Sequence, residues 1–272
     1  KLDASTKTAD DGTITQVNIS SSGLHRTQTE IKNKHALDQL VVGGTIQYLS
    51  NNLNAGLVTY TSSYSNAFVT GPLKYNQYNF TGKDLTNAGF HYNVTLQNIY
   101  FYGELAHSFQ GGFAMIQGAM ASLSRVISAV VVARSYDKDH HSFLTRSLGE
   151  TTEASNEKGM YIGLNVTPNK LITFAAYSDF FRFPWLKYRI DQPSNGFEIL
   201  GQAIYTPTKP FKLTLRVKTE SKQQNPDQTS DSSSIVKLDK TNYRIALAWN
   251  VHRTISLEHR TELVHYREAS IR

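Results

Sequence analysis

The feature that most constrains this chain is a period of two that returns along most of its length. From Gln39 onward about twelve segments, each about ten residues long, are rich in β-branched and aromatic residues and are separated by clusters of Gly, Pro, Asn and Ser. In 211–219, for example, Phe, Leu, Leu and Val alternate with Lys, Thr, Arg and Lys. Such alternation puts apolar side chains on one face of a strand and polar ones on the other. The chain is therefore predicted to be all-β.

The links between these segments alternate in length. Short links fall near residues 51, 97, 124, 168, 207 and 253, and long links cover 63–85, 136–158, 182–196 and 220–240. The link 108–112 is the exception, because it is short where the alternation calls for a long link. Outer-membrane barrels alternate tight periplasmic turns with longer external loops, and soluble meanders have no reason for this asymmetry. Segments of about ten residues also match the 9–11 residues that a tilted strand needs to cross a bilayer. We therefore expect an antiparallel up-and-down transmembrane β-barrel segment of about 12 strands.

A soluble β-barrel or β-sandwich that binds a ligand is the alternative, because its strands show the same alternation with the apolar face turned inward. The two architectures differ in whether apolar residues such as Leu215 and Trp249 face lipid or a closed core. No apolar run approaches the roughly 18 residues of a membrane helix, since the longest is 126–133. Any membrane crossing would therefore use strands.

The first 38 residues differ from the rest in being polar and rich in Ser and Thr. A candidate strand covers 13–20, and Thr27 to Glu30 fits the Ser/Thr-x-x-Glu capping pattern of a short helix. We divide the chain into a polar N-terminal segment, 1–38, and a barrel portion, 39–272. The segment is expected inside the barrel or at its periplasmic rim. The barrel portion is expected to be incomplete, because the chain lacks an initiating Met and an aromatic-terminated closing strand.

Motifs for catalysis are missing from the sequence. It contains no G-x-S-x-G turn, no H-E-x-x-H and no Gly-rich phosphate loop, and it has no cysteine for a thiolate metal site. The stretch 136–141 carries two Asp and two His residues, but it lacks the turn Gly and the bidentate Glu of a calcium loop. A solvated loop is therefore favoured over a metal site there. We expect no enzyme activity, no catalytic residue, no metal and no cofactor.

Basic residues on the polar faces of two consecutive segments are the first candidate site. They are Lys212, Arg216, Lys218 and Arg244. If the apolar faces meet lipid, these side chains line the lumen and attract phosphates or other anions. Glutamates on corresponding faces allow a second interpretation equally well, in which mixed charges form cross-strand pairs that stabilise a filled barrel. These glutamates are Glu104, Glu198, Glu258 and Glu262.

The second candidate is a cluster of aromatic and basic residues at one predicted loop. Its members are Phe181, Arg182, Phe183, Trp185, Lys187, Tyr188 and Arg189. Aromatic rings interleaved with cations can form a stacking platform for single-stranded nucleic acid or sugars. An interfacial aromatic belt, with Pro184 ending the strand, is the favoured interpretation.

This cluster, together with four other short stretches, resembles the large outer-membrane barrel proteins of Gram-negative bacteria that carry an N-terminal competence-type helix-hairpin-helix region. The other stretches are Asn156 to Gly159, Tyr161 to Leu164, Leu24 to Ile31 and Leu85 to Gly89. The resemblance runs from about residue 24 to the end, and it is to the barrel portion of those proteins only. It implies a bacterial outer-membrane location and a link to DNA binding or uptake.

The helix-hairpin-helix pattern itself does not occur in this sequence, so the region that would carry DNA binding is missing. The expected function is that of an outer-membrane β-barrel component linked to DNA uptake through that region. A general porin or a ligand-binding soluble barrel is the alternative. The expected partners are outer-membrane lipid and either nucleic acid or an envelope partner protein.

Overall fold

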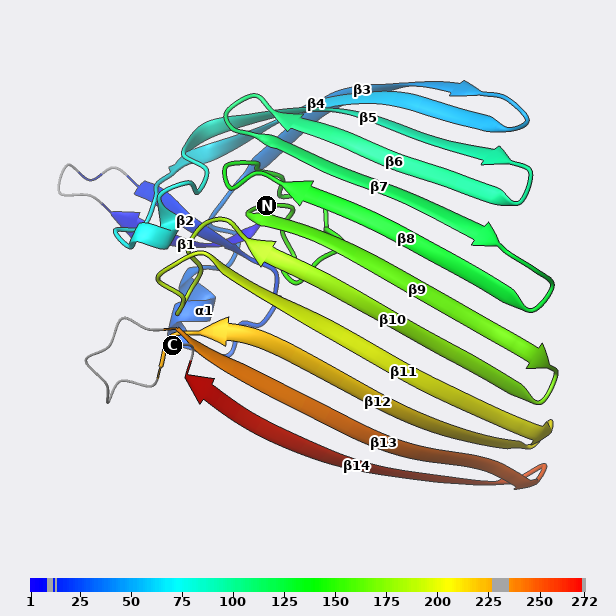
Figure 1. The fold of residues 1–272 in the computed structure, drawn as a ribbon. Helices are drawn as coiled ribbons and strands as arrows, with labels where there is room; N and C mark the ends of the chain where they lie inside the picture. The colour runs from blue at the N-terminus through cyan, green and yellow to red at the C-terminus, as the bar shows by residue number, and fades with distance from the viewer. Residues whose placement is uncertain (9–11, 13, 227–234, 271–272) are drawn as a thin grey trace. The chain divides into compact units, whose positions relative to one another are not determined.

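The computed structural model describes residues 1–8, 12, 14–226 and 235–270, and in this part the protein is all-β (Figure 1). The N-terminal segment contains β1 (Asp3–Thr8), β2 (Ile14–Ser20) and the short helix α1 (Gln28–Lys32). The strands that follow are β3 (Gln39–Leu49), β4 (Leu53–Phe68), β5 (Gly82–Leu96), β6 (Ile99–Ser108), β7 (Phe113–Ser122), β8 (Ile127–Tyr136), β9 (Glu157–Asn169), β10 (Ile172–Phe183), β11 (Ser194–Thr208), β12 (Phe211–Gln224), β13 (Val236–His252) and β14 (Ile255–Ser270). A short 3₁₀ helix, η1 (Lys74–Asn76), lies between β4 and β5.

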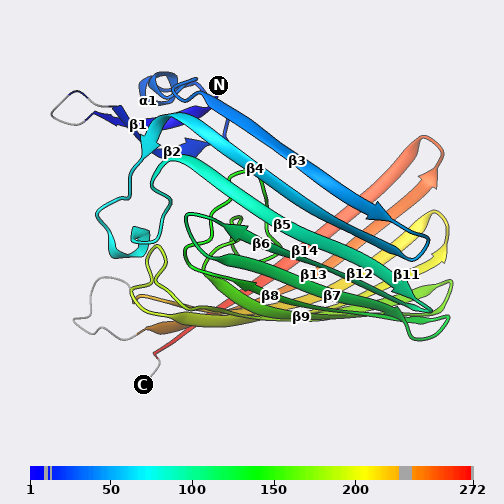
Figure 2. The ribbon, with the colours of Figure 1, turned by 90° about the horizontal axis from the view of Figure 1, so that it is seen from above.

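The strands β3 to β14 form a 12-stranded antiparallel up-and-down sheet in chain order, which confirms the sequence prediction (Figure 2). Two-residue to four-residue turns join them at 50–52, 97–98, 123–126, 170–171, 209–210 and 253–254. Longer connections occupy 69–81, 137–156, 184–193 and 225–235, and 109–112 is the short exception. The predicted alternation of short and long links is therefore present. No helix in the described ranges is long and apolar enough to cross a membrane.

The chain divides into two compact units. Unit 1 comprises Lys1–Tyr92, Glu104–Met115 and Tyr136–Asn156, and unit 2 comprises Asn93–Gly103, Ile116–Ser135 and Glu157–Arg272. The strands β5, β6, β7 and β8 contribute residues to both.

In unit 1, α1 begins at the capping box that the sequence predicts. The Thr27 hydroxyl accepts a hydrogen bond from the Glu30 N–H at 3.2 Å, and the Glu30 carboxylate accepts one from the Thr27 N–H at 3.0 Å. These reciprocal bonds satisfy backbone donors that the first helical turn leaves unpaired. The helix of five residues is too short to be stable alone, so its place depends on the chain around it.

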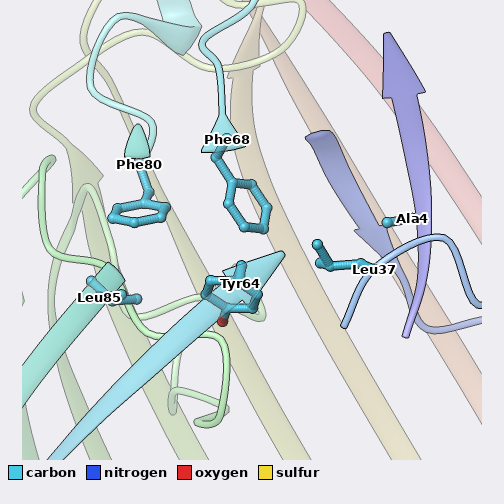
Figure 3. Close-up of a cluster of buried hydrophobic side chains, with 6 residues drawn as sticks. All are labelled: Ala4, Leu37, Tyr64, Phe68, Phe80 and Leu85. Atoms are coloured by element: carbon cyan, nitrogen blue, oxygen red, sulfur yellow. The ribbon is translucent and has the colours of Figure 1, made fainter. Parts of the chain in front are cut away.

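The buried core of unit 1 joins the N-terminal segment to the ends of β4 and β5 (Figure 3). It consists of Ala4, Leu37, Tyr64, Phe68, Phe80 and Leu85. Because Phe68 is the last residue of β4 and Phe80 lies in the connection 69–81, the N-terminal segment lies at the end of β4 that carries the long connection. The segment is therefore not at the rim of tight turns, which was one of its two expected positions, because Leu37 and Ala4 are buried against aromatic rings at the other end of β4. A position inside the barrel stays a prediction.

Candidate functional site

The sheet of unit 2 presents one apolar face and one polar face. Cross-strand partners lie on the same face, and the register pairs Leu215 with Ile245 and Arg216 with Arg244. The apolar side chains are 41% to 52% exposed: Met160, Ile162, Leu164, Phe174, Phe180, Ile199, Leu215, Val217, Tyr243, Ile245 and Trp249. A water-soluble sheet with one solvated face shows the opposite arrangement, with apolar side chains covered. The apolar face of unit 2 therefore has no protein cover among the described residues.

Aromatic rings lie at two levels of this apolar face. At the first level Phe180 and Phe197 pair across β10 and β11 with ring centroids 6.4 Å apart. At the second, Phe211 and Trp249 pair across β12 and β13 at 6.5 Å, close to the tight turns. Tyr205 belongs to the second level, since it pairs with Leu213 two residues from Phe211. Ala203 lies between the levels, and so do the rings of Phe174 and Tyr243: Phe174 pairs with Ala203, and the Tyr243 partner Val217 pairs with Gly201.

A cluster of charged side chains is buried on the polar face, and Arg134 of β8 lies at its centre. Its Nε donates to Glu157 of β9 at 2.7 Å, and its Nη1 and Nη2 donate to the two carboxylate oxygens of Asp179 of β10 at 2.8 and 3.1 Å. The side chains of Arg134 and Glu157 are fully buried. A Cβ at Gly159 would lie 2.4 Å from the Arg134 Cζ, so the absence of a side chain there makes room for the guanidinium.

This buried group was missed from the sequence. The apolar run 126–133 ends directly before Arg134, which is the one charged residue of β8 and lies on the polar face. A single arginine inside an otherwise apolar strand is a usable signal, because a buried guanidinium requires carboxylate partners. Its partners could not be identified, since they lie 23 and 45 residues further along the chain.

The predicted basic strip is present on the polar face but is interleaved with carboxylates. The Nζ of Lys218 lies 2.6 Å from a carboxylate oxygen of Glu198, whose other oxygen accepts a hydrogen bond from Tyr177. Arg244 forms an ion pair with Glu262. Lys212 and Arg216 form no ion pair within the described ranges. That all four side chains line a lumen stays a prediction.

The predicted aromatic and basic cluster is divided by the structure. Phe181 and Phe183 at the end of β10 are each 4% exposed, so they cannot act as an open stacking surface. Lys187 covers the Phe183 ring, with its Nζ 3.2 Å from the ring centroid. Arg182 is exposed on the opposite face, and Tyr188 is 67% exposed. The remaining members lie after the strand: Trp185 is half-buried, and Arg189 has a φ of 63°.

The stretch 136–141, where β8 runs into the connection 137–156 of unit 1, is buried or half-buried, so the expectation of a solvated loop there is wrong. The ring of Phe143 stacks on Phe68 at 5.2 Å, and the ring of His141 lies edge-on to Phe80 at 5.8 Å. His140 is 3% exposed, and its Nδ1 is 2.8 Å from the Ala154 carbonyl oxygen. Aromatic rings on β4 and on the connection 69–81 provide the cover that the sequence pattern could not reveal.

Burial dominates the protonation of both histidines. It lowers the pKa of His141 to about 4, with the neighbouring His140 contributing in the same direction. It also lowers the pKa of His140, against the hydrogen bond to the Ala154 carbonyl. Both rings are therefore neutral at pH 7. Within the described residues no group of His, Asp and Glu side chains is arranged to hold a metal ion.

Comparison with known proteins finds no matching family model, no matching curated protein and no matching solved structure.

Proposed function

We propose that this chain forms part of the wall of a bacterial outer-membrane β-barrel, with the apolar face of unit 2 against lipid and the polar face towards a lumen. The observation that carries the proposal is the exposure of Leu215, Ile245 and Trp249, while Arg134 and Glu157 on the opposite face are buried. In a bilayer, apolar side chains need no protein cover and backbone groups must be paired within the sheet.

The two aromatic levels have the spacing of interfacial girdles. Eight residue steps separate Phe197 from Tyr205 on β11, which at roughly 3.4 Å per residue is about 27 Å along the strand. A strand tilt of about 40° reduces this to about 20 Å, near the roughly 25 Å of the apolar band in such barrels. Rings at both levels would then lie near the headgroups, with Ala203 and Ile199 facing the acyl chains between them.

The soluble ligand-binding barrel is disfavoured by the same face. A soluble protein would expose a large contiguous patch of Leu, Ile, Phe and Trp side chains to water, and monomeric soluble proteins rarely do so. In a soluble barrel Trp249 would also point into a core, whereas 44% of it is exposed.

Within the envelope, we rank a role in nucleic-acid transport before a general porin. Lys212 and Arg216 have no carboxylate partner in the described part of the chain and would offer fixed positive charge to a polyanion. The link to DNA uptake itself rests on the resemblance to the helix-hairpin-helix barrel proteins. Ion pairs at Lys218 and Arg244 limit the net attraction, because their charge is compensated locally.

Tryptophan quenching by lipid tests the membrane location. The chain has two Trp residues, so Trp185→Phe leaves Trp249 as the only indole. The variant is reconstituted into vesicles of phosphatidylcholine that is brominated at a shallow or a deep acyl position. We expect strong quenching of Trp249, greatest with shallow bromines, because it lies near the tight turns.

The matched control is Trp249→Phe, which leaves Trp185 beside the end of β10 and is expected to show weak quenching. If Trp249 is not quenched at any bromine depth and the folded protein stays outside the vesicles, the proposed membrane location is wrong.

A further inference from the structure

A groove of about 680 Å³ lies on the polar face of unit 2, beside the tight turn at 97–98. Small residues form part of its floor, namely Gly163 on β9 and Ala175 on β10. The rings of Tyr161 and Tyr177 line it, with centroids 5.2 Å apart, and Tyr100 of β6 lines it as well. Its volume lies in the range of small-molecule sites, roughly 300–1,000 Å³.

The lining of this groove contains no Lys, Arg, Asp, Glu or His among the described residues. The polar face around it is otherwise rich in charge, since Arg134, Asp179 and Glu198 all lie on the same strands or on neighbouring ones. A nucleic acid or another polyanion would need cations in contact with its phosphates. The occupant that fits is therefore uncharged.

The polar groups of the groove are amides and hydroxyls. Asn165, Ser128 and Thr95 are exposed, and their side chains have no hydrogen-bond partner in the described ranges. They can donate to and accept from hydroxyl groups of a ligand. Aromatic rings provide apolar faces, on which the C–H side of a sugar ring can pack. Uncharged pyranose sugars combine such an apolar side with many hydroxyls.

We propose that this groove binds a neutral oligosaccharide, with Tyr100 and Tyr161 as ring platforms and Asn165 as a hydroxyl partner. The inference deepens the proposed function by adding a ligand class to the polar face. It rests on that function only in requiring the polar face to be open to water. Sugar binding can be measured in detergent solution, where lipid insertion is not needed, so the two proposals can fail separately.

The test is calorimetric titration of the full chain in detergent with three uncharged probes: maltotriose, cellotriose and the trimer of N-acetylglucosamine. We expect at least one to bind with a Kd of about 1 mM or lower, and Tyr100→Leu to weaken it about tenfold. The matched control is Tyr102→Leu, because Tyr102 stacks on Tyr100 at 5.7 Å but packs over Gly118 and does not line the groove.

A second variant, Ala175→Leu, fills the floor while keeping every ring and amide, and it should also weaken binding. Circular dichroism confirms that each variant is folded. The proposal is overturned if none of the three sugars binds, or if Tyr100→Leu and Tyr102→Leu weaken binding equally. It is also overturned if an oligothymidylate competes for the site with higher affinity than the sugars.

Discussion

Arg134 on β8 and Glu157 on β9 form an ion pair of 2.7 Å in which neither side chain reaches solvent. Asp179 on β10 adds a second carboxylate 2.8 Å from the same guanidinium. Three neighbouring strands are thus joined by one buried cation. Removing one partner of a buried pair leaves a charge without compensation, which is much more costly than removing both.

The first prediction concerns this pair. Arg134→Leu is expected to lower the free energy of unfolding by roughly 3–5 kcal/mol, because the buried carboxylate of Glu157 and the partly buried one of Asp179 lose their cation. The double variant Arg134→Leu with Glu157→Leu should be less destabilised than the sum of its single variants. Urea unfolding in detergent measures both. Additive single-variant effects would show that the pair is not coupled.

The second prediction concerns Gly159, which leaves the space that Arg134 occupies. A methyl group there would lie 2.4 Å from the Arg134 Cζ, and the guanidinium cannot move without losing its carboxylates. Gly159→Ala should therefore cost about 1–3 kcal/mol. Gly201→Ala on β11 is the control, because a Cβ there meets nothing within 4 Å. Equal melting temperatures for the two variants would contradict the steric argument.

The third prediction is a pH dependence of unit 1. Burial lowers the pKa of His141 from 6.5 to about 4. Between pH 4 and pH 6.5 the unfolded chain therefore binds more protons than the folded chain. The neutral His141 ring is compatible with its buried site, so unit 1 has its full stability above about pH 6.5. This stability falls by about 3 kcal/mol as the pH drops towards 4 and below, because the folded site resists protonation of the ring. Hydrogen exchange in 137–156 should therefore accelerate between pH 6.5 and 4, after correction for intrinsic rates.

The variant His141→Phe tests the origin of this effect. It keeps a ring beside Phe80 and should remove most of the acid sensitivity, whereas replacing the exposed His265 by Phe should not. Any acid-induced increase in the hydrogen-exchange rate that remains in His141→Phe is assigned to His140, because burial also lowers the pKa of His140. An unchanged acid response in His141→Phe would reject the assignment.

The fourth prediction separates the residues of the basic strip. Lys212→Gln and Arg216→Gln should each weaken binding of a single-stranded oligonucleotide and reduce its salt dependence by about one phosphate contact. Lys218→Gln should change binding less, because Glu198 already compensates that charge. Salt titrations of the full chain in detergent make the comparison. Equal slopes for all three variants and the wild type would remove the strip as a polyanion site.

Local pattern alone determined the strands, their faces and the cap of α1. The period of two in 211–219 assigns Leu215 and Arg216 to opposite faces, because consecutive side chains on any strand alternate. Thr27 and Glu30 make their reciprocal bonds within one helical turn, so their spacing was sufficient. The alternation of link lengths likewise needs no knowledge of which strands are neighbours.

Only the tertiary structure decided which side chains meet across strands. Arg134 finds Asp179 through the registers of β8, β9 and β10, and a shift of one residue would move every side chain to the other face. The connection 137–156 is rich in polar residues, yet Phe143 and His141 are packed because β4 and the connection 69–81 bring Phe68 and Phe80 to them. Such contacts join residues 45 or more positions apart, and sequence periodicity extends only over neighbouring residues, so it carries no information about them.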